Sequence, residues 1–277
     1  MEIGVGLPAV VPGASADLLL EWARKADAGP FSTLGVHDRL AWDGFECLGV
    51  LNAAAAVTER IKLASLVLIA PLRPAALIAG QAAAIQELSQ GRLTLGVGIG
   101  PRRDDYEAAG AGFGTRGRRL EEQLHEFRGH WDSGLARPRI LNGGGGDAAL
   151  ARMARHADGY VHGGGPPRAF KGAADRALAA WYDAGRLGSP RLLGTGYFAL
   201  GGREEEGRDF LRSYYRFVGP FAERIADGVL TGKDQIEELA GGYAQAGCDE
   251  LVLFPTVPSL EQLQLLAEIL PARLTAE

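Results

Sequence analysis

The chain has 277 residues, of which 47% are hydrophobic and 23% are charged, and its formal net charge is −5. This composition is typical of a globular protein, and the acidic balance argues against a nucleic-acid partner, because phosphate backbones bind to basic surfaces. The apolar runs are too short or too interrupted to cross a membrane, and no signal peptide is visible. We therefore expect no membrane partner and a cytoplasmic location.

The cysteines and histidines give no sign of a metal site. Cys47 and Cys248 are the only cysteines, which is too few for a disulfide framework or a zinc site. The five histidines lack the spacing of metal ligands. We expect no bound metal and two buried, unreactive thiols.

Eight strand-like runs are distributed along the chain. Most are continuously apolar rather than alternating, as expected for strands that are buried on both faces of a parallel sheet. They cover residues 3–7, 33–36, 62–69, 93–97, 139–142, 159–162, 192–200 and 250–254.

Helical segments separate these runs. They are predicted over residues 16–28, 48–58, 75–88, 116–131, 147–156, 168–184, 203–226, 233–246 and 260–270. Ser15, Asp147, Thr231 and Ser259 are predicted at or near helix N-caps. Gly219 and the following proline suggest that the 203–226 segment is two helices, which could form a lid.

The alternation of strand and helix, repeated about eight times without a linker, predicts a single (β/α)8 TIM barrel over residues 1–277. An open, doubly wound α/β sheet is the alternative, because a count of elements does not show whether the sheet closes. In a barrel, function lies at the carboxyl ends of the strands.

Three ionisable residues follow the second predicted strand: His37, Asp38 and Arg39. Such a cluster is unusual at a buried position, and the imidazole of His37 titrates nearest to neutral pH. We predict these three as catalytic candidates. A structural ion pair between Asp38 and Arg39 is the alternative.

The fourth predicted strand ends in GVGIGPRR, which contains Gly98 and Gly100. A GxGxG pattern alone is a weak signal, and it lacks the spacing of a dinucleotide-binding motif. Arg102 and Arg103 come directly after it, and Arg116, Arg118 and Arg119 lie downstream. These cations favour an anion-binding site near the two glycines.

A run of four glycines, 143–146, separates Asn142 from a predicted helix that begins at Asp147. Free backbone N–H groups and the helix dipole make such a turn a natural phosphate cradle. Asn142, Gly143, Gly144 and Asp147 are therefore predicted to bind a cofactor. A flexible turn without a ligand is the alternative.

The segment TERIKLASLVLIAPLRPAALIAGQAAAIQELSQGRLTLGVGIGPRRDDYEAAG, followed by RGRRLEEQL, resembles the bacterial-luciferase-like flavin-dependent oxidoreductases. Weaker similarity lies in RPRILNGGGGDAALARMARHADGY and IEELAGGYAQAGCDELVLFP, so the resemblance extends over nearly the whole chain. It implies a TIM barrel that binds FMN, or the deazaflavin coenzyme F420, at the carboxyl ends of the strands.

The resemblance also implies where the cofactor phosphate lies. It points to the turn that contains Gly143, Gly144 and Asp147, together with the loop after the fourth strand and an arginine such as Arg119. This agrees with the anion site that the glycines and arginines indicate by themselves.

The third predicted strand carries a second implied feature. Members of the family often have a non-prolyl cis peptide there, against the flavin ring. By position it would join Ser65 and Leu66, and these two residues are predicted to contact the cofactor.

Two departures from the family pattern affect these expectations. Many members carry an Asp-His pair after the second strand, whereas here Asp38 is followed by Arg39 and the histidine comes first. His37 therefore does not inherit the acid/base role by position. The connection between Trp131 and Arg137 is also short, so we expect an open active site or a homodimer in which the partner fills the gap.

These observations predict a flavin-dependent oxidoreductase. The leading hypothesis is a two-component monooxygenase that acts on a small-molecule substrate with reduced FMN from a separate flavin reductase. The alternatives are an F420-dependent reductase or dehydrogenase, and a barrel that binds flavin without turnover. Tyr214 and Tyr215 are among the aromatic residues that could line the substrate pocket.

Overall fold

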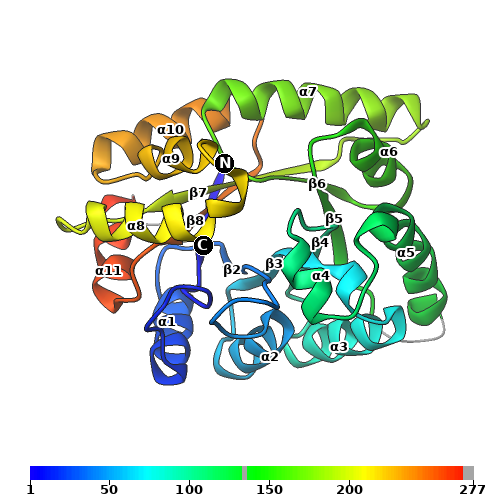
Figure 1. The fold of residues 1–277 in the computed structure, drawn as a ribbon, viewed down its shortest axis with the longest axis horizontal. Coiled ribbons are helices and arrows are strands. Elements are labelled where there is room, and N and C mark those ends of the chain that lie inside the picture. Colours follow the sequence, from blue (N-terminus) through cyan, green and yellow to red (C-terminus); the bar gives the residue numbers. More distant parts are fainter. Residues whose placement is uncertain (133–135, 271–277) are drawn as a thin grey trace, which may run out of the picture.

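Parallel strands form a closed barrel at the centre of the molecule (Figure 1). The computed structural model describes residues 1–132 and 136–270. Within these ranges the strands are β1 (Glu2–Gly6), β2 (Thr33–Val36), β3 (Lys62–Ile69), β4 (Leu93–Gly98), β5 (Arg139–Gly143), β6 (Gly159–His162), β7 (Arg191–Phe198) and β8 (Glu250–Pro255). They pair in chain order, and β8 returns to β1. The predicted TIM barrel is confirmed, and the open sheet is excluded.

Helices surround the strands (Figure 1). They are α1 (Ala16–Ala28), α2 (Cys47–Val57), α3 (Ala75–Leu88), α4 (Arg103–Ala108), α5 (Arg116–Asp132), α6 (Asp147–His156), α7 (Pro167–Asp183), α8 (Glu204–Tyr214), α9 (Phe221–Asp227), α10 (Lys233–Gln245) and α11 (Leu260–Ile269). Short 3-10 turns lie at η1 (Ala70–Leu72), η2 (Phe113–Thr115) and η3 (Arg216–Val218). In the described part of the chain, no helix has both the length and the apolar character that a membrane crossing needs.

The predicted elements agree closely with these bounds. The predicted 203–226 segment is divided by η3 and Gly219, as the glycine and proline suggested. Helix α4 was not predicted, because six residues are too few for a periodic pattern to be recognised. The short connection after Trp131 includes residues 133–135, which lie outside the described residues, so the expected open site stays a prediction.

Two of the predicted helix caps have the expected geometry. Ser15 accepts a hydrogen bond from the backbone N–H of Leu18, and Ser259 accepts one from Glu261. These bonds satisfy N–H groups that the first helical turn leaves unpaired. Asp147 and Thr231 lie one residue away from the N-cap positions, which Gly146 and Gly232 occupy.

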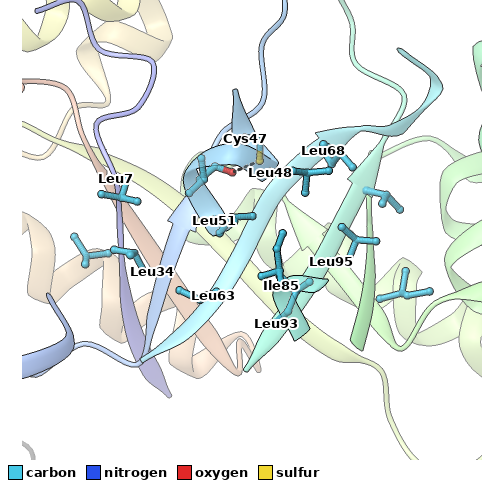
Figure 2. Close-up of a cluster of buried hydrophobic side chains, with 14 of the residues drawn as sticks. Leu7, Leu34, Cys47, Leu48, Leu51, Leu63, Leu68, Ile85, Leu93 and Leu95 are labelled. Carbon is cyan, nitrogen blue, oxygen red and sulfur yellow. Dashed lines mark hydrogen bonds between the residues drawn. The ribbon is translucent and has the colours of Figure 1, made fainter. Parts of the chain in front are cut away.

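Leucine packing explains why the strands are continuously apolar (Figure 2). Leu48 and Leu51 of α2 lie against the outer face of the barrel beside Leu34 of β2 and Leu63 of β3, and all four are fully buried. Burying one such side chain contributes about 1.5–3 kcal/mol. Because inward-facing residues fill the barrel as well, these strands need apolar side chains on both faces.

Strand β3 contains a local irregularity at the point where the resemblance implied a cis peptide. The pairing of β3 with β4 shifts register between Ser65 and Leu68. The cis peptide joins Leu66 and Val67, so the expected position between Ser65 and Leu66 was wrong by one residue. An apolar run carries no marker of register, so the sequence did not locate the bond.

A buried carboxylate ties three strands together at the amino ends of the barrel. Glu250 of β8 accepts hydrogen bonds at 2.5 Å from the hydroxyls of Ser32 and Thr33, and one at 2.6 Å from Arg191 of β7. The carboxylate is 3% exposed. Arg191 also contacts Glu2 of β1, whose side chain is 39% exposed.

The Glu250→Leu substitution is expected to lower the free energy of unfolding by about 3–5 kcal/mol, because it removes the acceptor of two hydroxyls and the buried one of the two carboxylates that pair with Arg191. Urea unfolding followed by circular dichroism measures the change. Glu2→Gln is the matched control, and it should cost less than about 1 kcal/mol because its ion pairs are solvated. Equal losses for the two variants would contradict the role of Glu250.

Candidate functional site

A pocket of about 500 Å³ opens at the carboxyl ends of the strands. This volume is within the range of small-molecule and cofactor sites. Its walls come from the ends of β2 to β7 and from the segment that joins α8 to η3. A second hollow, between α1 and α2, is lined almost entirely by aliphatic groups and by a single ionisable residue, Glu46. A third hollow, at the amino ends of the strands, is lined by charged residues that include Arg139 and Asp158. Because function in such barrels lies at the carboxyl ends of the strands, the first pocket is the candidate site.

Most of the predicted site residues meet in this pocket. The predicted residues that line it are His37, Asp38, Arg39, Leu66, Gly98, Gly100, Gly143 and Gly144. They come from separate strands, and barrel closure brings them together. Ser65, Arg119, Asn142 and Asp147 do not appear in the lining that the described residues provide.

These four residues have other contacts. Ser65 is buried and donates its hydroxyl to the carbonyl of Gly96, and Arg119 reaches the carbonyl of Arg73 at 3.5 Å. The amide of Asn142 donates to the carbonyl of Gly143 and to that of Ala149 in α6. The Asp147 side chain is 98% exposed beside Arg176. Their predicted role in cofactor binding stays a prediction.

His37 is the start of a chain of hydrogen bonds across the pocket. Its Nδ1 lies 2.7 Å from the carbonyl oxygen of Leu66, and its Nε2 lies 3.2 Å from the hydroxyl of Tyr197. That hydroxyl is 2.6 Å from the hydroxyl of Tyr215. A carbonyl only accepts, so Nδ1 carries the proton, Tyr197 donates to Nε2, and Tyr215 donates to Tyr197. Tyr215 therefore presents an acceptor oxygen to a ligand.

The surroundings of this chain favour neutral side chains. Burial lowers the pKa of His37 to about 4, and its ring stacks on Phe254 with centroids 3.7 Å apart. Burial also raises the pKa of Tyr197 well above its usual value. His37 is therefore neutral at neutral pH. It can hold a fixed hydrogen-bond direction, but it is a weak base.

Asp38 is engaged by other protein groups. Its two carboxylate oxygens accept hydrogen bonds from Arg73 at 2.7 and 2.8 Å, and the backbone N–H of Ile69 donates to it at 2.8 Å. The side chain of Asp38 is fully buried. This pair joins the end of β2 to the η1 turn after β3, and it holds the rim of the pocket in place.

Arg39 is held in a similar way, although its partner differs from the one weighed from the sequence. Its Nε donates to Asp105 of α4 at 2.8 Å, and that carboxylate also accepts from the backbone N–H groups of Leu40 and Ala41. Asp38 pairs with Arg73, so the alternative of an Asp38–Arg39 pair was wrong. Asp38 and Arg39 are adjacent in the chain, yet they form ion pairs with different residues.

The opposite side of the pocket is built from glycine and Arg116. A side chain at Gly98 or Gly143 would meet Val67 at 2.7 or 3.1 Å, and Gly144 has a φ of +119° that other residues rarely adopt. The side chain of Arg116 lines this end, and its Nε has no partner within residues 1–132 and 136–270. The Nη1 of Arg116 donates to the carbonyl of Phe113 at 2.8 Å. Exposed backbone and a guanidinium with an unpaired Nε suit a phosphate.

One part of the site was not found from the sequence. Tyr197 lines the pocket from within β7, in an apolar run that gave no sign of a hydrogen-bonding role. Gly163 also lines the pocket, and it belongs to a glycine-rich turn after β6 that repeats the pattern found after β5. Tyr214 and Tyr215 were suggested as lining residues, and both contribute to the pocket. The only signal for them was an aromatic pair at the end of a charged helix.

Comparison with known proteins agrees with this architecture. A family model described as luciferase-like monooxygenase matches residues 1–247. The chain belongs to this family. The resemblance inferred from the sequence is therefore confirmed.

Curated relatives match about half of the chain. An uncharacterized protein of Mycobacterium tuberculosis, Rv0940c, is 34% identical over 52% of this chain and 65% of its own length. An FMNH2-dependent dimethylsulfone monooxygenase of Pseudomonas fluorescens is 30% identical over 49% of this chain and 44% of its own length. The chain thus matches less than two thirds of the length of these relatives.

Solved structures share the fold at low identity. An F420-dependent secondary alcohol dehydrogenase superposes with a TM-score of 0.81 at 14% identity, and 98% of each chain is covered. The monooxygenase RslO1 of Streptomyces bottropensis gives a TM-score of 0.77 at 19% identity, with the same coverage. An F420-dependent dehydrogenase and a monooxygenase therefore both share this barrel.

His37 is expected to titrate near pH 4 rather than near 6.5, because burial disfavours the imidazolium. The imidazole nitrogen signals of 15N-labelled protein, followed from pH 3.5 to 8, should show a proton on Nδ1 throughout the neutral range. The His37→Gln variant assigns the signal. A midpoint between pH 6 and 7 would contradict the assigned burial.

The lowered pKa of His37 also makes the stability of the folded protein depend on pH. Since the pKa in the folded state lies below that in the unfolded state, acidification from about 6.5 to about 4 protonates the unfolded chain first and favours unfolding. His37→Gln should therefore weaken the loss of stability in this pH window.

Proposed function

We propose that this protein is a flavin-dependent monooxygenase that uses reduced FMN on a small organic substrate and receives the reduced flavin from a separate reductase. Family membership supports an oxidoreductase of this kind. The relative from Pseudomonas fluorescens is named for the use of FMNH2. The observation that carries the proposal is the division of the strand-end pocket into an anion-binding end and a hydrogen-bonding end.

The residues present fit a flavin mononucleotide. Gly98, Gly143 and Gly144 expose backbone at one end, and Arg116 supplies a cation with an unpaired Nε. We assign the phosphate to this end. Apolar side chains of β3, Leu66 and Val67, line the middle of the pocket and would lie against the flat ring.

When bound, reduced FMN supplies the electrons and the reactivity toward oxygen. The protein's own residues orient the reactants and keep water away. The His37–Tyr197–Tyr215 chain presents a fixed acceptor oxygen to a polar hydrogen of the substrate or cofactor. His37 is neutral, so we assign it the positioning of Tyr197 in place of proton abstraction.

Anaerobic titration with reduced FMN, with reduced FAD and with reduced coenzyme F420 tests the proposal. We expect reduced FMN to bind with a Kd of about 10 µM or below. With NADH, oxygen and a flavin reductase, a substrate of the enzyme should gain one oxygen atom from 18O2. Tight binding of F420 without binding of FMN would overturn the proposal in favour of hydride transfer.

Substitution of Arg116 by Met is expected to weaken FMN binding by about tenfold or more, because a charge-assisted hydrogen bond to phosphate is worth about 1.5–3 kcal/mol. Riboflavin lacks the phosphate, so its affinity should not change. Arg118→Met is the matched control, since its guanidinium is 74% exposed and pairs with Glu122.

Arg119→Met completes the comparison, because Arg119 is the arginine that the family resemblance indicated. If Arg119→Met loses more FMN affinity than Arg116→Met, the phosphate contact belongs to Arg119 and not to Arg116. Calorimetric titration of each variant with both flavins measures the difference.

A further inference from the structure

Arg102 is a buried cation without a counter-ion at the rim of the pocket. It is 5% exposed, it ends the loop between β4 and α4, and it lines the pocket. Within the described ranges it forms no ion pair, and its Nη2 has no hydrogen-bond partner. Buried guanidinium groups are normally paired, so the site lacks an acceptor.

Aromatic rings hold this guanidinium in position. Its central carbon lies 4.2 Å from the ring centre of Phe217, 4.9 Å from that of Tyr214 and 5.8 Å from that of Trp42. Ring faces attract a cation, but they do not replace the hydrogen bonds of its N–H groups. The rings therefore orient Arg102 and leave Nη2 available to a ligand.

Arg39 brings a second positive charge to the same rings. Its guanidinium carbon lies 5.2 Å from the ring of Trp42 and 5.4 Å from that of Tyr214. Asp105 takes its Nε and Asp104 accepts from its Nη2 at 3.3 Å, whereas its Nη1 is buried without a hydrogen-bond partner in the described part of the chain. Burial, and then the charge of Arg39, lower the pKa of Arg102.

The other ionisable groups of the pocket do not supply the missing charge. Asp38 is the carboxylate in the lining, and Arg73 and a backbone N–H already occupy it. His37 is neutral. Arg116 stacks on Phe113, whereas Arg102 stacks on Phe217 and Tyr214, so the two guanidinium groups are held by different rings.

We propose that Arg102, with Arg39 beside it, binds the carboxylate of an organic substrate. This inference rests on the proposed function, and it gives that function a substrate class. A carboxylate matches the planar guanidinium and would accept hydrogen bonds from both unpaired nitrogens. The rest of the substrate would extend toward the acceptor oxygen of Tyr215, which lines the same pocket.

The test uses the FMN-loaded protein and three acids, benzoate, phenylacetate and hexanoate, each paired with its neutral amide. Calorimetry should show that the protein binds at least one acid about tenfold or more tightly than its amide, as expected for a charged hydrogen bond. Arg102→Met should remove this preference, and Arg102→Lys should retain part of it. Arg103→Met is the matched control, because Arg103 is exposed and does not line the pocket.

The melting temperature distinguishes a binding role for Arg102 from a structural one. If Arg102 binds substrate, Arg102→Met should not lower the melting temperature of the ligand-free protein, because the substitution removes an unpaired buried charge. A clear fall in melting temperature with no loss of acid preference would overturn the proposal, as would a failure of all three acids to bind more tightly than their amides.

Two further readouts separate this inference from the proposed function. If Arg102→Met weakens FMN but not riboflavin, Arg102 belongs to the cofactor phosphate site, and the substrate assignment fails while the flavin function stands. The acid titration is repeated without flavin. If the protein binds no flavin but still prefers acids in a way that depends on Arg102, the anion site stands and the proposed monooxygenase function fails.

Discussion

The closure of the parallel sheet is the constraint on which the rest of the structure depends. Hydrogen bonds between β8 and β1 complete the barrel, and they bring the carboxyl ends of all the strands to one rim. His37, Gly98 and Gly143 are far apart in the chain, yet they line one pocket for this reason. At the amino ends, Glu250 supports the closure by joining β8 to Arg191 of β7 and to the residues that begin β2.

The distribution of charge at the rim follows from how the carboxylates are used. Asp38 is taken by Arg73 and Asp105 by Arg39, so each of these acids supports the loop structure. No comparable acid in the described ranges pairs with Arg102 or with the Nε of Arg116. The chain is acidic as a whole, but its pocket is locally cationic. A buried cation is costly unless a ligand pairs with it, which is why the pocket suits anionic groups.

Sequence reasoning predicted the positions of the site well and the contacts of individual side chains less well. The glycines at the ends of β4 and β5 could be placed in the pocket because a cluster of glycines at the end of a strand is visible in the sequence. The partner of Arg39 could not, since Asp105 lies in a helix too short to be recognised from its pattern. Arg119 and Arg116 are three residues apart, and only the direction of α5 determines which of them reaches the pocket.

Closure of the sheet was decided by the structure, whereas the sequence by itself determined the alternation of strands and helices, the family, and the edge of the sheet at which the pocket lies. These properties depend on patterns that repeat along the chain: apolar strands, amphipathic helices and glycine-rich turns. Only the tertiary structure decided that Tyr197 joins His37 to Tyr215, that the cis peptide follows Leu66, and that Arg102 has no counter-ion among the residues it describes. Hydrogen bonds and ion pairs act over about 3 Å, so they depend on positions in space that the order of residues along the chain does not record.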